Sequence, residues 1–297
     1  MKKEYIPFVE GLIDLAIRED IGDGDHTSLA SIPADAQGRM KLLVKERGII
    51  AGVEVAEMVF RRLDPLVRLE VFIPDGTPVE VGDIVFYVSG TVRTLLQSER
   101  VILNIMQRMT GVATETARYV ERVAGTGCRI LDTRKTTPGN RVLDKMAVTI
   151  GGGQNHRMGL FDMILLKDNH VDFAGGIVEA ITGVRRYMAS KGLSLPIEVE
   201  VRSLEDIDLV FSEMASSGGR VDRIMFDNFD PEMTRLGVER VAALSRRNGL
   251  QERVETESSG GIRYENLREY ADCGVDFISI GALTHQIKSV DLSLKAI

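Results

Sequence analysis

The pattern of apolar and polar positions near the start of the chain predicts an amphipathic helix. Its apolar residues recur at helical spacing and are Phe8, Val9, Leu12, Ile13, Leu15, Ala16 and Ile17. Glu10, Asp14 and Arg18 interrupt this stretch, which argues against the apolar region of a secretory signal peptide. No apolar run approaches the roughly 18 residues that a membrane span requires. We therefore expect a cytoplasmic protein that does not cross a membrane.

The pattern becomes β-like from about residue 38 to residue 90. KLLVKERGIIAG, VRLEVFIP and DIVFYVSG are short apolar or alternating runs separated by turn-forming segments such as PDGTPVEVGD. Residues 94–123 then predict a helix, whose apolar face consists of Leu95, Leu96, Val101, Ile102, Ile105 and Met106. These elements indicate a small N-terminal α/β layer.

Six short apolar runs follow residue 127, in the order CRIL, MILL, IEVEV, RIMF, RVET and FISI. Segments of helical composition separate most of them, so we expect parallel strands joined by crossover helices. Polar clusters end most of these runs: DTRK at 132–135, KDNH at 167–170, DNF at 227–229, SSGG at 258–261 and GALTH at 281–285. Because the carboxyl ends of barrel strands converge on one site, a closed or nearly closed α/β barrel fits better than an open doubly wound sheet.

The run IEVEV at 197–201 places valine and glutamate on opposite faces of a strand, because side chains alternate along it. If the apolar face packs on helices, Glu198 and Glu200 face the barrel lumen or its mouth. An edge strand with a solvated face is the alternative that this run leaves open.

The charge distribution argues for a local anion site in an acidic protein. The 297-residue chain carries a net charge of -7, which gives no general attraction to nucleic acid or to an anionic membrane. Residues 131–170 nevertheless hold six Lys or Arg against four Asp. The two cysteines, Cys128 and Cys273, are too few for a disulfide framework and favour a reducing compartment.

The residue types at these strand ends suit a small polyanion. Arginine pairs with a carboxylate through two parallel hydrogen bonds, so Arg134 and Arg157 could hold two carboxylates of one ligand. Gly260 and Gly281 follow the last two runs, where barrels often bind phosphate through backbone N–H groups. The alternatives are basic residues on a solvated face, a structural His156, and salt bridges that involve Glu200 and Asp227.

Several longer motifs closely resemble the quinolinate phosphoribosyltransferase family, over nearly the whole chain and in the family's order. They are REDIGDGDHTS at 18–28, SERVILNIMQRMTGVAT at 98–114, DTRKTTPG at 132–139, GGGQNHRMGLFDMILLKDNH at 151–170, EVEV at 198–201, DNF, SSGGI at 258–262 and GALTH. The resemblance implies an N-terminal α/β sandwich domain over residues 1–112, completed by residues 286–297. It also implies an incomplete α/β barrel of about seven strands over residues 113–285.

The resemblance further implies the reaction of quinolinate with phosphoribosyl pyrophosphate in the presence of Mg²⁺, giving nicotinate mononucleotide, pyrophosphate and CO₂ in de novo NAD biosynthesis. Implied quinolinate-binding residues are Arg100, Arg134, His156, Arg157 and Lys167. Implied catalytic residues near the phosphoribosyl pyrophosphate are Lys135, Glu200 and Asp227, of which Glu200 and Asp227 are also the implied magnesium ligands. Implied phosphate-binding residues are Ser259, Gly260, Gly261, Gly281 and His285.

The resemblance places Arg100 in the site of a neighbouring subunit, so it implies a homodimer, with a hexamer left open. Two features depart from the family pattern: Thr149, where many relatives carry a basic residue, and ASSGGRVD at 215–222, which we interpret as a surface insertion. Two other functions compete with this one. The first is a phosphoribosyltransferase for another acceptor, including the pyrophosphorylase-like proteins associated with molybdenum transport, and the second is a catalytically silent barrel.

Overall fold

The computed structural model describes residues 1–250 and 253–297, which form two compact units. Unit 1 comprises Met1–Arg118, Lys135–Gly153 and Ala282–Ile297, and unit 2 comprises Tyr119–Arg134 and Gln154–Gly281. These units are groups of residues in mutual contact, and each combines separate chain segments. The expected domain boundaries at residues 112 and 285 stay predictions. Among the described residues, no helix is both long enough and apolar enough to cross a bilayer.

Unit 1 is built on a four-stranded antiparallel sheet with the strand order β12-β1-β5-β3. Its strands are β1 (Gln37–Val44), β3 (Arg68–Val71), β5 (Ile84–Thr91) and β12 (Leu292–Ala296), and β2 (Gly48–Ile49) pairs separately with β4 (Pro78–Val79). Strand β12 lies beside β1, with Leu294 opposite Leu42. The end of the chain therefore supplies an edge strand to the sheet of its N-terminal part.

Unit 1 also contains helices. They are η1 (Lys3–Tyr5), α1 (Ile6–Ile21), α2 (His26–Ser31), α3 (Val53–Leu63), α5 (Arg141–Ile150), α11 (Ala282–His285) and most of α4 (Val92–Arg122). Helices α1 and α4 confirm the two predicted helices. Helix α3 was not predicted, since residues 38–90 were interpreted as β-like throughout. Its Phe60 ring packs edge to face on Phe86 of β5, with ring centroids 6.1 Å apart.

Unit 2 contains a six-stranded, wholly parallel sheet with the strand order β6-β11-β10-β9-β8-β7. Its strands are β6 (Arg129–Leu131), β7 (Ile164–Leu166), β8 (Ile197–Val201), β9 (Arg223–Asp227), β10 (Glu255–Ser259) and β11 (Phe277–Ser279). Every predicted apolar run overlaps one of these strands. The resemblance implied about seven strands; the structure has these six, with an isolated parallel bridge between Gln154 and Leu131 beside β6.

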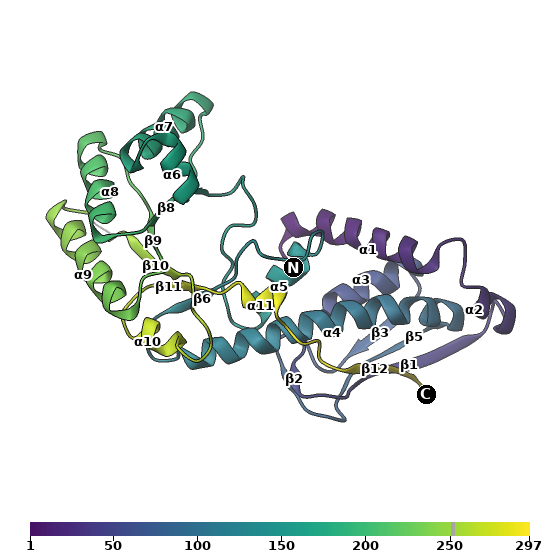
Figure 1. The fold of residues 1–297 in the computed structure, drawn as a ribbon. Helices are drawn as coiled ribbons and strands as arrows, with labels where there is room; N and C mark the ends of the chain where they lie inside the picture. The colour runs from purple at the N-terminus through teal and green to yellow at the C-terminus, as the bar shows by residue number, and fades with distance from the viewer. Residues whose placement is uncertain (251–252) are drawn as a thin grey trace. The chain divides into compact units, whose positions relative to one another are not determined.

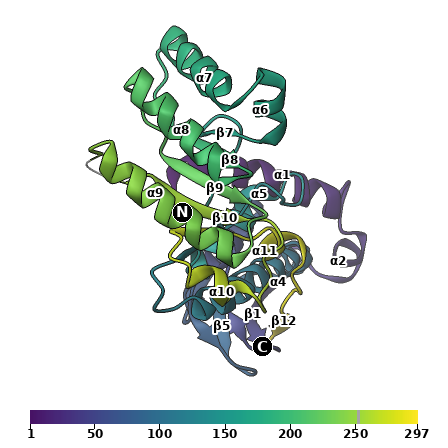
Figure 2. The same ribbon diagram turned by 60° about the vertical axis from the view of Figure 1, so that its left-hand side comes forward.

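Crossover helices line one side of this sheet. They are α6 (Asp168–Ala174), α7 (Ile177–Lys191), α8 (Leu204–Ser217), α9 (Pro231–Arg247) and α10 (Leu267–Ala271). In both ribbon views α7, α8, α9 and α10 follow one another along the same side of the strands (Figures 1 and 2). This arrangement of parallel strands with outer helices is that of an α/β barrel that does not close.

The strand β8 separates an apolar outer face from a polar inner face. Val199 and Val201 lie beside Ile224 and Phe226 of β9, and all four side chains are buried. Glu198 and Glu200 occupy the opposite face by strand alternation. Strand β8 pairs with both β7 and β9, so the edge-strand alternative is wrong and the interpretation of lumen-facing glutamates is confirmed.

The segment 215–222 is only partly a surface feature. Its first residues end α8 and are exposed, as expected. Val221, however, is fully buried, and the carboxylate of Asp222 accepts a hydrogen bond of 2.8 Å from the backbone N–H of Ile197 at the start of β8. The surface interpretation is therefore wrong for the second half of the segment, because these residues join β8 to β9.

Candidate active site

Titratable side chains gather on the inner face of the unit 2 sheet. Strand register places Glu198, Arg223 and Glu255 side by side on β8, β9 and β10. Four residues further along these strands, Asp227 at the end of β9 lies beside Ser259 at the end of β10. The polar strand ends predicted to converge are thus brought together for these two neighbouring strands.

Lys167 and Glu200 form an ion pair at the carboxyl ends of β7 and β8. The Lys167 Nζ lies 3.0 Å from Glu200 Oε2, and the lysine side chain is 45% exposed whereas the glutamate side chain is 7% exposed. The Glu200 carboxylate is thereby held from one side. Lys167 also caps α6, where its backbone N–H donates to Nδ1 of His170. This capping fixes the start of the helix, and with it the position of the lysine backbone.

Arg134 and Arg157 are close enough to act on each other electrostatically. Burial and the nearby positive charge of Arg134 lower the pKa of Arg157, against the opposing effect of Glu198 and Asp162. Arg157 is buried and donates from Nη1 to the carbonyl of Met163 at 3.2 Å. Arg134 is exposed. Two guanidinium groups placed together favour a bound anion, because it relieves their mutual repulsion.

Asp132 organises the loop that carries His156 and Arg157. The Asp132 side chain is fully buried; its Oδ1 accepts from the backbone N–H of His156 at 2.9 Å and its Oδ2 from Nδ2 of Asn155 at 2.7 Å. Within the DTRK cluster, the carboxylate of Asp132 therefore holds the backbone of the neighbouring loop.

The loops after β9 and β10 are tightly coupled. Asn228 has a positive φ of 56°, and its backbone N–H donates to the carbonyl of Ser259 at 2.9 Å. A Cβ at Gly260 would lie 2.3 Å from the Asn228 side-chain oxygen, so only glycine fits there. Gly261 also has a positive φ, of 64°. The two glycines predicted to bind phosphate thus occupy conformations that most residues avoid.

Three of the predicted site residues belong to unit 1. Arg100 is exposed on α4, and its side chain forms no hydrogen bond or ion pair within residues 1–250 and 253–297. Lys135 and His285 are both exposed, and the Lys135 carbonyl accepts a hydrogen bond of 3.0 Å from Oγ1 of Thr284. Lys135 and His285 are therefore near each other in the fold, through α11.

The glycine run at 151–153 serves packing in unit 1. A Cβ at Gly151 would lie 2.3 Å from the Ala113 carbonyl oxygen, and one at Gly153 would lie 2.8 Å from Thr116. Both neighbours belong to α4. The absence of side chains thus lets this turn lie against the helix. Thr149, just before the run, donates from its hydroxyl to the Lys145 carbonyl inside α5.

Two polar residues of the inner face, Glu257 and Arg223, were missed from the sequence. Glu257 is completely buried on β10, and Arg223 of β9 lies 3.0 Å from it. The predicted strand RVET ended before Glu257. The segment ETESS is polar at every position, so its hydrophobic pattern carries no signal, although Glu255, Glu257 and Ser259 do alternate with Thr256 and Ser258 as strand faces require.

The chain matches two family models that together span most of its length. Residues 25–110 match the model described as "Quinolinate phosphoribosyl transferase, N-terminal domain", and residues 112–295 match "Quinolinate phosphoribosyl transferase, C-terminal domain". The junction between the two matches lies within α4.

Similar proteins carry related names. The chain is 42% identical to a chloroplastic "Nicotinate-nucleotide pyrophosphorylase [carboxylating]" of Oryza sativa subsp. japonica, over 97% of this chain and 77% of the relative. It is 39% identical to the Mycobacterium leprae protein named "Nicotinate-nucleotide pyrophosphorylase [carboxylating]", over 94% of both chains. The solved structure of NadC from Streptococcus pyogenes superposes with a TM-score of 0.85 at 35% identity, over 97% of each chain. Together with the family models, these similarities establish that the chain belongs to the quinolinate phosphoribosyltransferase family.

Proposed function

We propose that this chain transfers the phosphoribosyl group of phosphoribosyl pyrophosphate to quinolinate and releases CO₂. The products are nicotinate mononucleotide, pyrophosphate and CO₂, in a step of NAD biosynthesis. The observation that carries the assignment to particular residues is the pair Arg134 and Arg157, two guanidinium groups close enough for the charge of Arg134 to lower the pKa of Arg157. Quinolinate carries two ring carboxylates and matches such a pair.

Quinolinate binds through bidentate contacts to the two arginines and a point charge from Lys167. Arg157 is buried and held through the Met163 carbonyl, so it presents its guanidinium in a fixed orientation. Lys167 is half-exposed and paired with Glu200, so its ammonium group is oriented but accessible. His156 belongs to the same group by resemblance, and Arg100 joins it from a second subunit.

The phosphorylated substrate binds at the loops after β9, β10 and β11. Ser259, Gly260, Gly261 and Gly281 are the residues proposed to hold its phosphates, since glycine lets backbone N–H groups approach closely. Lys135 and His285 join them by resemblance alone. Glu200 and Asp227 suit Mg²⁺, which prefers one or two carboxylates supplemented by substrate phosphates. When bound, the ion would neutralise the charge of the pyrophosphate.

The two carboxylates also suit the charge that develops during reaction. As the bond from C1 of the ribose to the pyrophosphate oxygen breaks, the ribose ring gains positive charge. Glu200 and Asp227 stabilise that charge more than they stabilise the neutral ground state. The quinolinate nitrogen then forms the new bond to C1. The resulting pyridinium ring accepts the electron pair released when the bond to the adjacent carboxylate breaks, and C2 takes up a proton.

A homodimer is the minimum assembly that this proposal requires, because Arg100 acts in the site of the neighbouring subunit. The Arg100 side chain is exposed and unpaired within the described residues. An arginine that binds a ligand in another subunit must be accessible in this way. Exposed apolar side chains flank β7, with Phe173 at 92%, Leu160 at 71% and Phe161 at 69% exposure. Such side chains favour a protein partner. A hexamer of three dimers is compatible with these features.

A cytoplasmic location completes the proposal. Cys128 and Cys273 are both buried and form no disulfide with each other. Burial and neighbouring charges raise the pKa of the Cys128 thiol to about 12, so this thiol stays protonated and unreactive. A protein with such cysteines has no need of an oxidising compartment.

The decisive experiment is detection of products by mass spectrometry after the protein is mixed with phosphoribosyl pyrophosphate, Mg²⁺ and either quinolinate or nicotinate. We expect nicotinate mononucleotide and CO₂ from quinolinate and no product from nicotinate. Product from nicotinate would assign the chain to phosphoribosyl transfer without decarboxylation. If the chain neither binds nor turns over phosphoribosyl pyrophosphate, it has lost the family's activity.

A further inference from the structure

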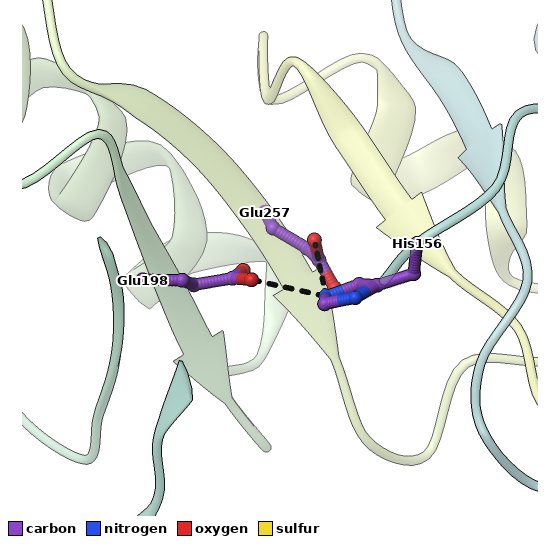
Figure 3. Close-up of side chains that lie close together, drawn as sticks. All are labelled: His156, Glu198 and Glu257. Carbon is purple, nitrogen blue, oxygen red and sulfur yellow. Dashed lines mark ion pairs between the residues drawn. The ribbon is translucent and has the colours of Figure 1, made fainter. Parts of the chain in front are cut away.

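Three buried ionisable side chains meet on the inner face of the unit 2 sheet, and one of them, His156, is next to Arg157 in sequence. His156, Glu198 and Glu257 come from the loop after residue 153, from β8 and from β10, and point toward one another (Figure 3). The imidazole Nε2 of His156 lies 3.0 Å from Glu198 Oε2 and 3.6 Å from Glu257 Oε2. Both glutamates are 0% exposed. Two carboxylates are costly to bury unless charged or hydrogen-bonding groups compensate them, so this arrangement needs an explanation.

The two ring nitrogens of His156 are used for different purposes. The backbone N–H of Arg157 donates to Nδ1 at 2.7 Å, so Nδ1 acts as an acceptor and carries no proton. A neutral imidazole with an unprotonated Nδ1 carries its proton on Nε2, and that nitrogen faces the two carboxylates. His156 therefore links the backbone of Arg157 to Glu198 and Glu257 inside the protein.

The same geometry argues against a metal ion at this cluster. The candidate ligand atoms of His156, Glu198 and Glu257 lie within 4.8 Å of one another, a separation that a cation could bridge. A metal at Nε2 would require that nitrogen to be unprotonated, while Nδ1 already accepts a hydrogen bond. Arg223, 3.0 Å from Glu257, also supplies positive charge in the place where a cation would be needed.

The loop between Asn155 and Met163 is fixed at three places around this histidine. Asp132 holds the His156 backbone, Nδ1 of His156 holds the Arg157 backbone, and the Met163 carbonyl holds the Arg157 guanidinium. The Nε2 end of the ring is the remaining point, and it faces the carboxylates of the two glutamates at 3.0 and 3.6 Å. Without them the ring could rotate about its side-chain bonds and release the Arg157 N–H.

We infer that Glu198 and Glu257 are positioning residues, which lock the ring of His156 so that the ring in turn orients Arg157 for the carboxylate-bearing substrate. His156 thus acts through Arg157 and does not offer a ring nitrogen to that substrate, which differs from the role that the family resemblance implies. This inference rests on the proposed function for the identity of the substrate. The network of contacts itself is independent of it.

The charge balance of the cluster is consistent with this role. The guanidinium of Arg223 lies 3.0 Å from Glu257 Oε2. This positive charge counters the negative charge of the buried carboxylates.

The first test measures the proton on His156 directly. In ¹⁵N-labelled protein, with His156→Asn to assign the signals, we expect the His156 ring to show a protonated Nε2 and an unprotonated Nδ1. This readout needs no turnover, so it stands even if the proposed reaction fails. A protonated Nδ1, or an Nε2 signal that changes on metal removal by a chelator, would overturn the inference.

The second test compares Glu257→Gln with Glu255→Gln. Both changes remove a carboxylate of β10 that contacts Arg223, but the Glu255 side chain is 41% exposed and does not contact His156. In Glu257→Gln we expect KM for quinolinate to rise about tenfold, because the ring loses one of the two carboxylates that face its Nε2. KM for phosphoribosyl pyrophosphate should stay within about twofold. In Glu255→Gln both constants should be unchanged.

A double-mutant cycle shows whether Glu257 acts through the histidine. If it does, Glu257→Gln has no further effect on KM for quinolinate once His156→Asn is present, because the link is already broken. Additive effects in the double variant, or an equal rise in both KM values in Glu257→Gln, would mean a general structural role and contradict the inference.

Discussion

At the scale of single residues, buried acidic side chains fix the positions of other residues in the unit 2 site. Asp132, Glu198 and Glu257 are each completely buried, yet Asp132 has a different role from the two glutamates. Asp132 holds a loop backbone, whereas the two glutamates face a histidine ring. In the motif DTRK the sequence pointed to the basic residues as ligand-binding residues. The aspartate of the motif is the residue that holds the neighbouring loop.

Glu257 should make the stability of the protein depend on pH. Its pKa rises from 4.5 to about 7 in the folded protein. The folded state therefore binds a proton more readily than the unfolded state between these pH values, and the resulting stabilisation is complete below pH 4.5 and lost as pH rises through 7. At about 1.4 kcal/mol per pKa unit the loss amounts to at most about 3 kcal/mol.

The measurement is urea unfolding of the wild-type protein and of Glu257→Gln between pH 5 and pH 8.5. We expect the wild-type protein to lose free energy of unfolding relative to the variant as pH rises, since glutamine cannot ionise. Glu255→Gln serves as the control on the same strand. If the curves of the wild-type protein and Glu257→Gln run parallel over this range, Glu257 does not titrate there.

At the scale of secondary-structure elements, close packing of helices on the sheet depends on individual glycines. Gly237 lies in α9, and a Cβ there would lie 2.9 Å from the ring of Phe226. That ring is fully buried and stacked on Phe229, with centroids 5.2 Å apart, so it has little room to move. The glycine allows α9 to approach the outer face of β9.

Gly237→Ala should therefore destabilise the protein although alanine favours helix. Alanine gains about 1 kcal/mol in helix propensity, but overpacking a rigid core costs about 1–3 kcal/mol. The matched control is Gly183→Ala in α7, where a Cβ would meet nothing within 4 Å; that change should stabilise by up to about 1 kcal/mol. Thermal unfolding of both variants tests these two expectations. Stabilisation in both variants would show that the Phe226 ring can move to make room for the alanine methyl group.

The sequence predicted elements well where the hydrophobic pattern follows the fold and poorly where it does not. The six parallel strands were found because their outer residues, such as Val199 and Phe226, pack on helices and must be apolar. Helix α3 was missed because Val53, Glu54 and Val55 alternate as a strand would. Glu257 was missed because β10 is polar on both faces.

The candidate site could be predicted as a set of residues but not as a geometry. Arg134, Lys167 and Glu200 could be named because strand ends carry function in barrels and because the motifs resemble a family. The role of Asp132, and the engagement of both ring nitrogens of His156, depend on contacts between segments that no spacing in the sequence encodes. Position along a strand predicted the place of these residues, whereas their hydrogen bonds required the structure.

At the scale of the whole molecule, the unit 2 site draws on strand ends far apart in the sequence. Residues 134, 167, 200, 227 and 259 each follow or end a different strand. The protein as a whole is acidic, with a net charge of -7, so the basic residues of the site act over a short range. The protein therefore attracts anions weakly at long range, while the basic residues of the site bind them strongly at short range. This combination suits small anionic substrates whose products are also anionic and must leave.

Arg100 should serve the site of a neighbouring subunit, and mixed dimers test this directly. Arg100→Ala removes the contributed arginine, and Lys167→Ala removes a residue that we assign to the subunit's own site. Each variant alone should have little activity, because every site in either homodimer lacks one group. In a mixed dimer one site carries both defects and the other carries none. Random association should therefore restore about a quarter of wild-type activity.

The experiment uses co-expression of the two variants with different affinity tags and purification of the mixed dimer, in which half of the wild-type activity per dimer is expected. Each variant co-expressed with itself is the control. An inactive mixed dimer would mean that Arg100 acts within its own subunit, since each site of the mixed dimer would then lack one group. Full activity of Arg100→Ala alone would remove the reason for proposing a shared site.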